Sequence, residues 1–291
     1  MPFESQSQRL FMTLKAFLKL VLPPFVLEIY RALRRAASPS ADRFVCAPHG
    51  WNTKLPAARG RGYESAGVIA FYRDGWAPFV KALQNTHTKL VTDLGPDPDS
   101  WRMACEHNGF MTFGYVLALA AQRKDALKVL DYGGSLGTFY FIGRALIPDV
   151  PLEYHCKELP EMARAGQEMS SEIIWHTDDS CFGERYDLVM FSGSLQYVRD
   201  WQEALRKASR ATRAYLYLWA VPVVERVGTY VAVQRHAGAL ILCQQFNKAE
   251  LLATIDGTGL RLIREFWLED HPHIANAPEQ PSFYGCLLKR E

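Results

Sequence analysis

The most constraining feature of the sequence is a glycine-rich turn that directly follows an apolar run ending in an acid. The segment runs from Val129 to Gly137 and reads VLDYGGSLG. Glycines in such a turn permit positive φ angles and let a ligand approach the backbone closely. Amides at the start of the following helix can then donate hydrogen bonds to that ligand. The segment therefore predicts a buried strand, a ligand-binding turn and a helix, in that order.

Strand-like apolar runs alternate with helix-like segments around and after this turn. Strands are predicted at 126–131, 152–157, 172–176, 186–192, 214–221, 260–268 and 282–289, and helices at 66–84, 100–121, 138–146, 160–169, 201–209 and 248–258. Such alternation is typical of an α/β protein with a mostly parallel sheet. The final strand, 282–289, is expected to run antiparallel.

The ligand predicted at this turn differs from a dinucleotide. The G-x-G-x-x-G spacing fails, because Ser135 and Thr138 occupy the later glycine positions when counting starts at Gly133. The carboxylate of Asp131 would also lie beside a pyrophosphate and repel it. An acid at the end of the strand suits a ligand that carries an ammonium group.

These residues resemble the first motif of class I S-adenosylmethionine (SAM)-dependent methyltransferases, an apolar strand and an acid followed by G-x-G-x-G. Asp131, Gly133 and Gly137 match it, whereas Ser135 replaces the middle glycine and Gly134 lies beside it. The resemblance implies a Rossmann-like α/β fold that uses SAM as cofactor. It also implies that the segment from Gly133 to Gly137 wraps the methionine part of SAM.

Further matches follow in the order that the resemblance implies. Glu158 ends the next strand, about 20 residues after Gly137, where the family places an acid that binds the ribose hydroxyls. Its alternatives are a solvated acid at a helix start and Glu153 as the ribose ligand, although Glu153 lies at the opposite end of the strand. In the family, a polar residue after the third strand contacts adenine, and Asp178 or Asp179 corresponds to it here. The segment after the family's fourth strand passes beneath the sulfonium, and it corresponds to Ser192 to Gln196.

The resemblance covers about residues 98–291, which are predicted to form the SAM-binding domain, and leaves 1–97 as an N-terminal helical extension or lid. The whole chain also resembles a little-characterised bacterial group assigned as methyltransferases. The matching segments are 132–137, 158–160, 192–197 and 233–234. Suspected roles of that group in surface-glycan or secondary metabolism imply a glycan or small-molecule acceptor, and we expect O-methylation.

Methylation of a hydroxyl often needs a general base, and histidine is the side chain that titrates near neutral pH. Two loops are expected at the ligand face. One follows the strand 214–221 and carries His236; the other, between the last two strands, carries His271 and His273. The short second loop favours His271 and His273, while each of the three can also be an ordinary surface histidine. No metal is required.

Composition restricts partners and location. The net charge of +2 is too small to indicate a nucleic-acid-binding surface. Cysteines occur singly, without C-x-x-C spacing, which predicts reduced thiols and a cytoplasmic protein.

The N-terminal residues 9–35 are basic and amphipathic, and Pro23 and Pro24 interrupt them. This segment can lie peripherally on the inner face of a membrane, or pack on the protein itself or on a second subunit in a homodimer. Its charges and prolines make it unsuitable for spanning a bilayer.

Two alternatives to a methyltransferase remain at this point. A nicotinamide-dependent oxidoreductase, using NAD(P) on a Rossmann fold, is disfavoured by the glycine spacing and by Asp131. A non-catalytic scaffold with a degenerate methyltransferase fold is disfavoured because Asp131, Gly133, Gly137 and Glu158 are all present. Binding of SAM would discriminate among the three.

Overall fold

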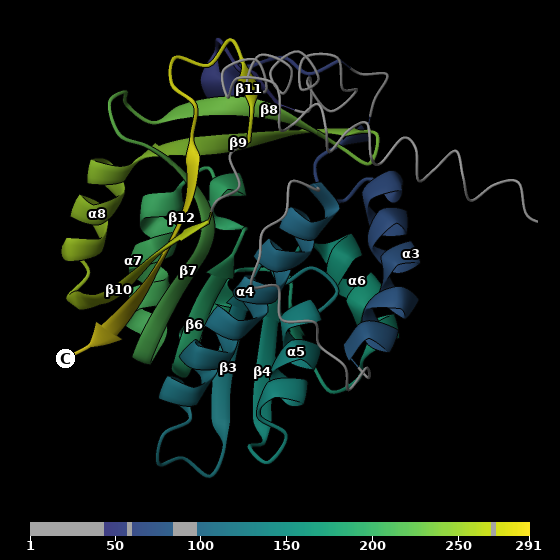
Figure 1. The fold of residues 1–291 in the computed structure, drawn as a ribbon, viewed down its shortest axis with the longest axis vertical. Coiled ribbons are helices and arrows are strands. Elements are labelled where there is room, and N and C mark those ends of the chain that lie inside the picture. The colour runs from purple at the N-terminus through teal and green to yellow at the C-terminus, as the bar shows by residue number, and fades with distance from the viewer. Residues whose placement is uncertain (1–43, 57–59, 84–97, 269–271) are drawn as a thin grey trace, which may run out of the picture. The chain divides into compact units, whose positions relative to one another are not determined.

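The predicted alternation of strands and helices builds a central sheet covered on both faces. The computed structural model describes residues 44–56, 60–83, 98–268 and 272–291 (Figure 1). The main sheet has the strand order β5-β4-β3-β6-β7-β12-β10. Its strands are β3 (Leu127–Tyr132), β4 (Leu152–Lys157), β5 (Ile174–His176), β6 (Tyr186–Ser192), β7 (Thr212–Val224), β10 (Leu260–Leu268) and β12 (Ser282–Arg290).

The direction of these strands confirms the expected fold class. Strands β3 to β7 run parallel to their neighbours in the main sheet, and β12 runs antiparallel to both β7 and β10. The order reverses at β3, which has β4 on one side and β6 on the other. In open α/β sheets, ligands bind at the carboxyl ends of the strands beside such a reversal. The glycine-rich turn follows β3 at this place.

Helices lie on both sides of the sheet. Figure 1 shows α3 (Ala66–Leu83), α4 (Pro98–Ala120), α5 (Thr138–Leu146) and α6 (Pro160–Met169) on one side, with α7 (Trp201–Ala211) and α8 (Lys248–Asp256) on the other. The bounds of α5 and α6 agree with those predicted from the sequence. Pro160 begins α6 at a position where its missing amide hydrogen costs nothing.

A separate hydrophobic cluster fills each side of the sheet. Phe113 and Leu117 of α4 pack against Val129 on one side. Trp201 and Leu205 of α7 pack with Leu130 and other residues on the opposite side. Each fully buried side chain of this kind contributes about 1.5–3 kcal/mol. Because successive residues of β3 face opposite clusters, the end of this strand is held from both sides.

A second, smaller sheet extends from the carboxyl end of β7. Strands β8 (Tyr230–His236) and β9 (Ala239–Asn247) form an antiparallel hairpin, and β9 pairs with β7 through Val223 and Phe246. The hairpin also pairs with β1 (Phe44–Cys46) and β2 (Gly60–Arg61), and β11 (Ile274–Ala275) pairs with β1.

This hairpin corrects the sequence prediction, which placed His236 in a loop after the strand 214–221, whereas His236 is the last residue of β8. The connection consists of Ala237 and Gly238, both with positive φ (44° and 81°). Two such residues match the twist of a tight antiparallel hairpin. Ala-Gly is a weaker signal of this turn than Asn-Gly or Asp-Gly, and this explains why the sequence pattern alone missed it.

The predicted extension includes strand as well as helix, since β1 and β2 pair with strands from the C-terminal part of the chain. Residues 44–291 belong to one compact unit. The amphipathic segment 9–35 of this extension lies outside the described residues. In the part of the chain that the structure describes, no helix is both long and apolar enough to cross a membrane.

Candidate ligand site at the carboxyl edge of the sheet

The loop between β3 and α5 has the conformation expected of a ligand-binding turn. Gly133 and Gly137 both have a φ of 81°, and Ser135 between them has a φ of 56°. Ser135 thus adopts a left-handed conformation, which glycine adopts more readily than serine.

The loop rests directly on the segment that follows β6. A Cβ atom on Gly133 would lie 2.4 Å from the Cβ of Ser194. The hydroxyl of Ser194 donates a hydrogen bond to the carbonyl of Tyr132. Leu195, Gln196 and Tyr197 continue this segment as a short 3-10 helix, η3. The predicted methionine-binding and sulfonium-facing segments are therefore in contact.

Asp131 lies beneath this loop. Its side chain is fully buried, and its Oδ2 accepts a 2.8 Å hydrogen bond from the hydroxyl of Tyr154. Among the described residues, Oδ1 has no hydrogen-bond partner. Burial raises the pKa of Asp131 to about 7, against the smaller opposing effect of the Tyr154 hydrogen bond. In this structure the loop separates the carboxyl group from solvent.

Glu158 joins the ends of β3 and β4. Its Oε1 accepts a hydrogen bond from the backbone amide of Ser135, and its Oε2 accepts one from the amide of Leu159, both at 2.8 Å. Burial raises the pKa of Glu158 despite these two bonds. Each carboxylate oxygen retains a second lone pair, so the group can also accept hydrogen bonds from two hydroxyls of a ligand. Glu153 lies near the other end of β4, as its position in the sequence predicted.

The remaining predicted cofactor residues lie around the same edge. Asp178 caps the short helix η2 (Asp179–Gly183) by accepting a 2.9 Å hydrogen bond from the amide of Ser180. Asp179 accepts hydrogen bonds from the hydroxyl of Tyr132 (3.2 Å) and from Lys207 (2.8 Å). Ser192 ends β6 and is half-buried. The hydrogen bond with Tyr132, the last residue of β3, links Asp179 to the end of that strand.

Three buried polar atoms at this edge lack partners among the described residues: Oδ1 of Asp131, Oγ of Ser135 and Oε1 of Gln196. A buried polar atom without a partner costs about 1–3 kcal/mol. Two of these atoms belong to the glycine loop and the segment it rests on. The atoms of Ser135 and Gln196 fit a ligand that brings hydrogen-bond donors to this position, whereas the carboxyl group of Asp131 is sealed beneath the loop.

The histidines predicted as bases occupy different places. His236 ends β8, with its ring centroid 4.9 Å from that of Phe71 and 6.0 Å from that of Tyr63. His273 is exposed and directly precedes β11, which is separated from β8 by β1. His271 lies outside the described residues. The connection that carries His271 and His273 also contains β11, so it is not the short hairpin loop that the sequence suggested.

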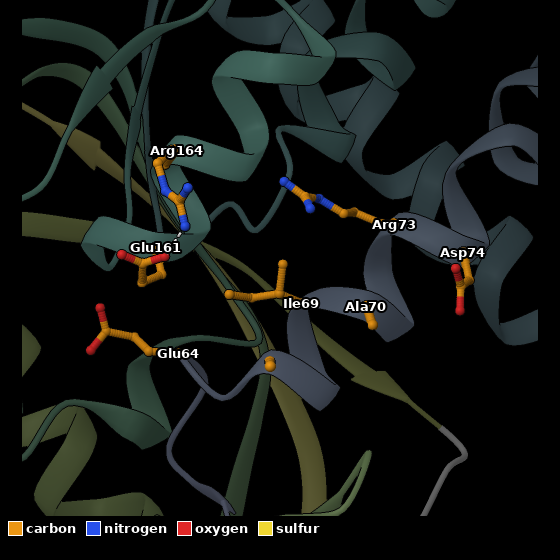
Figure 2. Close-up of a pocket in the computed structure, with 8 residues that line it drawn as sticks. Glu64, Ile69, Ala70, Arg73, Asp74, Glu161 and Arg164 are labelled. Atoms are coloured by element: carbon orange, nitrogen blue, oxygen red, sulfur yellow. Dashed lines mark hydrogen bonds and ion pairs between the residues drawn. The ribbon is translucent and has the colours of Figure 1, made fainter.

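An open pocket of about 330 Å³ lies between α3 and α6. Figure 2 shows Glu64, Arg73, Glu161 and Arg164 around it, with Arg164 paired to Glu161. Burial is the main cause of the raised pKa of Glu158 and the charge of Glu64 adds to it, whereas the two backbone hydrogen bonds and Lys157 lower it. The pocket therefore lies close to the acid predicted to bind ribose.

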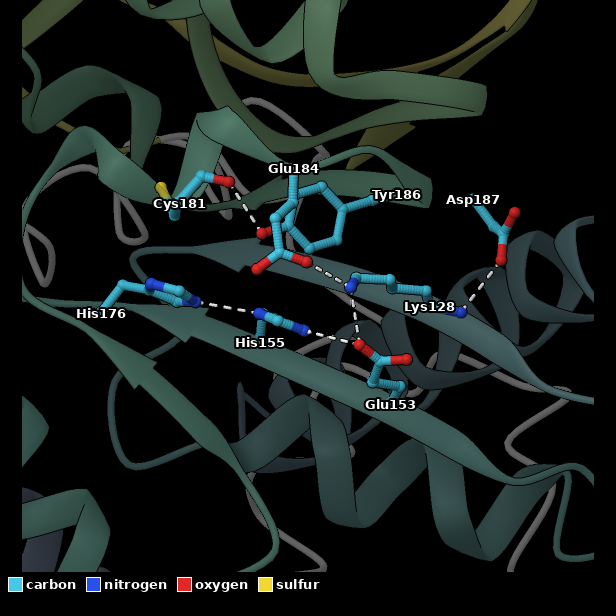
Figure 3. A network of polar contacts seen from close by, with 8 residues as sticks. All are labelled: Lys128, Glu153, His155, His176, Cys181, Glu184, Tyr186 and Asp187. Carbon is cyan, nitrogen blue, oxygen red and sulfur yellow. Dashed lines mark hydrogen bonds and ion pairs between the residues drawn. The ribbon is translucent and has the colours of Figure 1, made fainter.

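A charged network occupies strands β3 and β4 away from the glycine loop (Figure 3). The ammonium of Lys128 lies 2.6 Å from Glu153 and also pairs with Glu184. The hydrogen bond from Lys128 lowers the pKa of Glu153. Glu153, His155 and Glu184 offer ligand atoms within 4.8 Å of one another. The lysine already supplies the positive charge that these carboxylates need, so we assign the network to structure.

Several residues of this edge carried no sequence signal. Tyr154 lies in the middle of a strand, and nothing in its position indicates a bond to Asp131. Ser194 and Tyr197 stand in the segment matched to the family, but their contacts depend on how two loops meet. Gly134 is close-packed for the same reason, because a Cβ atom there would lie 2.4 Å from Oδ2 of Asp131.

Replacing Gly133 with Ala is expected to destabilise the protein by about 2–4 kcal/mol, because the new Cβ meets Ser194 and the residue must keep a positive φ. Ligand affinity should fall with it. Thermal unfolding measures the first effect. Gly183→Ala is the control, since its Cβ would meet nothing within 4 Å. Equal stability of both variants would show that the loop is not packed as described.

Comparison with known proteins identifies the fold. Neither a protein-family model nor a curated protein matches the sequence. Among solved structures, the chain is similar to a protein of Galdieria sulphuraria provisionally described as a sarcosine dimethylglycine methyltransferase, with a TM-score of 0.51, 11% identity and coverage of 77% of this chain and 98% of that chain. Magnesium protoporphyrin IX methyltransferase from Synechocystis PCC 6803 with bound S-adenosylhomocysteine has a TM-score of 0.47, 11% identity and coverage of 77% and 99%. The similarity to the Galdieria protein establishes that this chain has a methyltransferase-type fold.

Proposed function

We propose that the protein is a SAM-dependent methyltransferase. The observation that carries this proposal is the joining of the glycine loop to Glu158 at the carboxyl ends of β3 and β4. This arrangement sets a turn able to hold the methionine part beside a carboxylate able to hold the ribose. The loop from Gly133 to Gly137 would then bind methionine, Asp178 or Asp179 adenine, and Ser192 to Gln196 would lie beneath the sulfonium.

When bound, SAM supplies an electrophilic methyl group, and the chain has to hold an acceptor in line with it. The solved structures similar to this chain include enzymes crystallised with small molecules, such as 1,6-didemethyltoxoflavin in the enzyme from Burkholderia thailandensis. By analogy, we propose a small-molecule or glycan acceptor for this chain, methylated on oxygen. His236 is the preferred base, because it is the last residue of β8 and lies beside aromatic residues near η3. His273 instead precedes β11, on the far side of β1 from β8.

The alternatives are less well supported. For a nicotinamide cofactor, the buried carboxyl group of Asp131 directly beneath the loop is unfavourable, since a pyrophosphate would lie over it. A scaffold that had lost catalysis would have no reason to keep unpartnered polar atoms at the loop. We also propose that the chain divides into an extension (1–97) and a cofactor-binding domain (98–291). A homodimer, a cytoplasmic location and peripheral membrane contact through residues 9–35 are proposals as well.

Isothermal titration calorimetry of the full chain with SAM, S-adenosylhomocysteine and NAD tests the proposed function. We expect saturable binding of the first two ligands and none of NAD, because the loop lacks the dinucleotide spacing and has an acid beneath it. Binding of NAD alone would favour the oxidoreductase. Binding of none of the three would favour the scaffold.

A further inference from the structure

Five aromatic side chains from three separate segments gather over η3. We call them the aromatic wall: Tyr63, Phe71, Tyr72, Tyr197 and His236. The ring centroids of Tyr63 and Tyr197 are 4.8 Å apart with an interplanar angle of 74°, and those of Phe71 and Tyr72 are 5.6 Å apart at 84°. The rings of Phe71 and Tyr72 lie 4.9 Å and 5.9 Å from that of His236.

A chain of hydrogen bonds orders the polar ends of the wall. A hydrogen bond links the side chains of Tyr63 and Tyr197. The hydroxyl of Tyr197 in turn donates to Oε1 of Gln234 at 2.7 Å. Gln234 is buried within β8 and fixes the end of this chain. The pKa values of both tyrosines are raised, chiefly by burial, so their hydroxyls remain protonated at neutral pH.

The wall is built where the start of α3 meets the β8–β9 hairpin. A Cβ atom on Gly67 would lie 2.6 Å from the carbonyl oxygen of Ala237, so the helix and the hairpin turn touch through their backbones. Leu136 of the glycine loop belongs to the same cluster of packed side chains as Tyr63 and Tyr197. Tyr197 also directly follows Gln196, whose Oε1 is unpartnered among the described residues. The wall therefore borders the proposed cofactor site.

The chemistry of the wall restricts what it can bind. The neighbours that most affect the pKa of Tyr63 are Tyr197, Tyr72 and Cys243, and burial raises the pKa of both Tyr197 and Cys243. Arg235, next to His236 in the chain, is exposed. Glu64 and Arg73, which directly follow Tyr63 and Tyr72, are exposed as well. Among the described residues, an ionic group buried against the wall would therefore have to draw its counter-charge from these solvated side chains, at a cost in free energy.

The same surface discriminates between kinds of neutral ring. Rings that meet at steep angles leave faces and edges to which another aromatic ring can pack, at centroid distances of 4.5–7 Å. A sugar would bury several hydroxyl groups, each of which needs a partner. The hydroxyls of Tyr63 and Tyr197 are already engaged with each other and with Gln234.

We propose that the aromatic wall is the acceptor site of the proposed methyltransferase, and that it takes an uncharged aromatic ring bearing a hydroxyl group. This inference rests on the proposed function and narrows its acceptor to phenol-like compounds. Phe71, whose side chain is 56% exposed, forms the rim of the site. His236 also lies in the wall.

The test measures binding of 2-naphthol to the full chain saturated with S-adenosylhomocysteine, by ligand-observed NMR and calorimetry. Sodium 2-naphthoate and methyl α-glucoside serve as charged and sugar probes. The variant Phe71→Ser removes an exposed ring and should leave folding intact. Tyr115→Ser is the matched control, because Tyr115 is an exposed aromatic on α4 that packs under Arg264.

We expect 2-naphthol to bind, the other two probes to bind at least about tenfold more weakly, and Phe71→Ser to weaken 2-naphthol binding by about two- to tenfold, as for loss of one aromatic pair. Tyr115→Ser should change nothing. Absence of 2-naphthol binding, equal binding in Phe71→Ser, or preference for the glucoside would overturn the aromatic acceptor while leaving cofactor binding intact. Failure of S-adenosylhomocysteine to bind would instead overturn the proposed function, and the acceptor site with it.

Discussion

Asp131→Asn is expected to make the protein more stable at pH 8 and to remove most of a pH dependence that the native chain shows. Burial raises the pKa of Asp131 to about 7, well above the value of 3.8 that an unfolded chain would show. The folded state therefore binds the proton more tightly, and stability falls as the pH rises from about 4 through 7. The shift corresponds to an upper limit of about 4 kcal/mol. Above pH 7 the dependence should level off.

Chemical denaturation at several pH values between 4.5 and 8 measures this effect. The asparagine variant keeps an oxygen that can accept the Tyr154 hydrogen bond, but carries no charge. Asp187→Asn is the matched control, since Asp187 is also buried but has a 2.9 Å ion pair with Lys124. That variant should lose stability at pH 8, because it breaks the ion pair. A loss of similar size in Asp131→Asn would mean that the carboxylate is stabilised by a partner.

Glu158→Ala is expected to weaken SAM binding by about 1–3 kcal/mol, or roughly 5- to 150-fold, which is the range for an unmade hydrogen bond to a charged group. Two effects combine: the ribose loses its acceptor, and the amide of Ser135 loses the bond that holds the glycine loop. Glu158→Gln keeps one acceptor oxygen, so its affinity for SAM should lie between those of Glu158→Ala and the native chain. Calorimetry with SAM measures all three proteins.

The control for this experiment is Glu161→Ala. Glu161 begins α6 three residues later and is exposed, with its side chain paired to Arg164. Removing it should leave SAM affinity nearly unchanged, since surface ion pairs contribute little. Unchanged affinity in Glu158→Ala would place the ribose elsewhere. A loss of affinity as large in Glu161→Ala would point to the open pocket between α3 and α6.

Strands and helices of the central sheet were predicted closely because each carries its own local signal. The bounds of β4, β6, α5 and α6 match the predicted ranges. Strand β3 is largely buried on both faces, and its apolar residues Leu127, Val129 and Leu130 mark it as a strand of a parallel sheet. The hairpin β8–β9 was missed, since its turn, Ala237 and Gly238, lacks a strong turn signal. Its strands are held by pairing with β1 and β7, which lie far away in the sequence.

The sequence by itself determined the order of elements, the glycine turn and the position of Glu158 at a strand end, because these depend on residue type and local spacing. Only the tertiary structure decided that Glu158 binds the amide of Ser135, that Asp131 is sealed beneath the loop by Gly134, and that Tyr63 meets Tyr197. It also decided which predicted histidine approaches η3. Each of these contacts joins residues from different elements, and its distance follows from how helices and strands pack rather than from their separation in the chain.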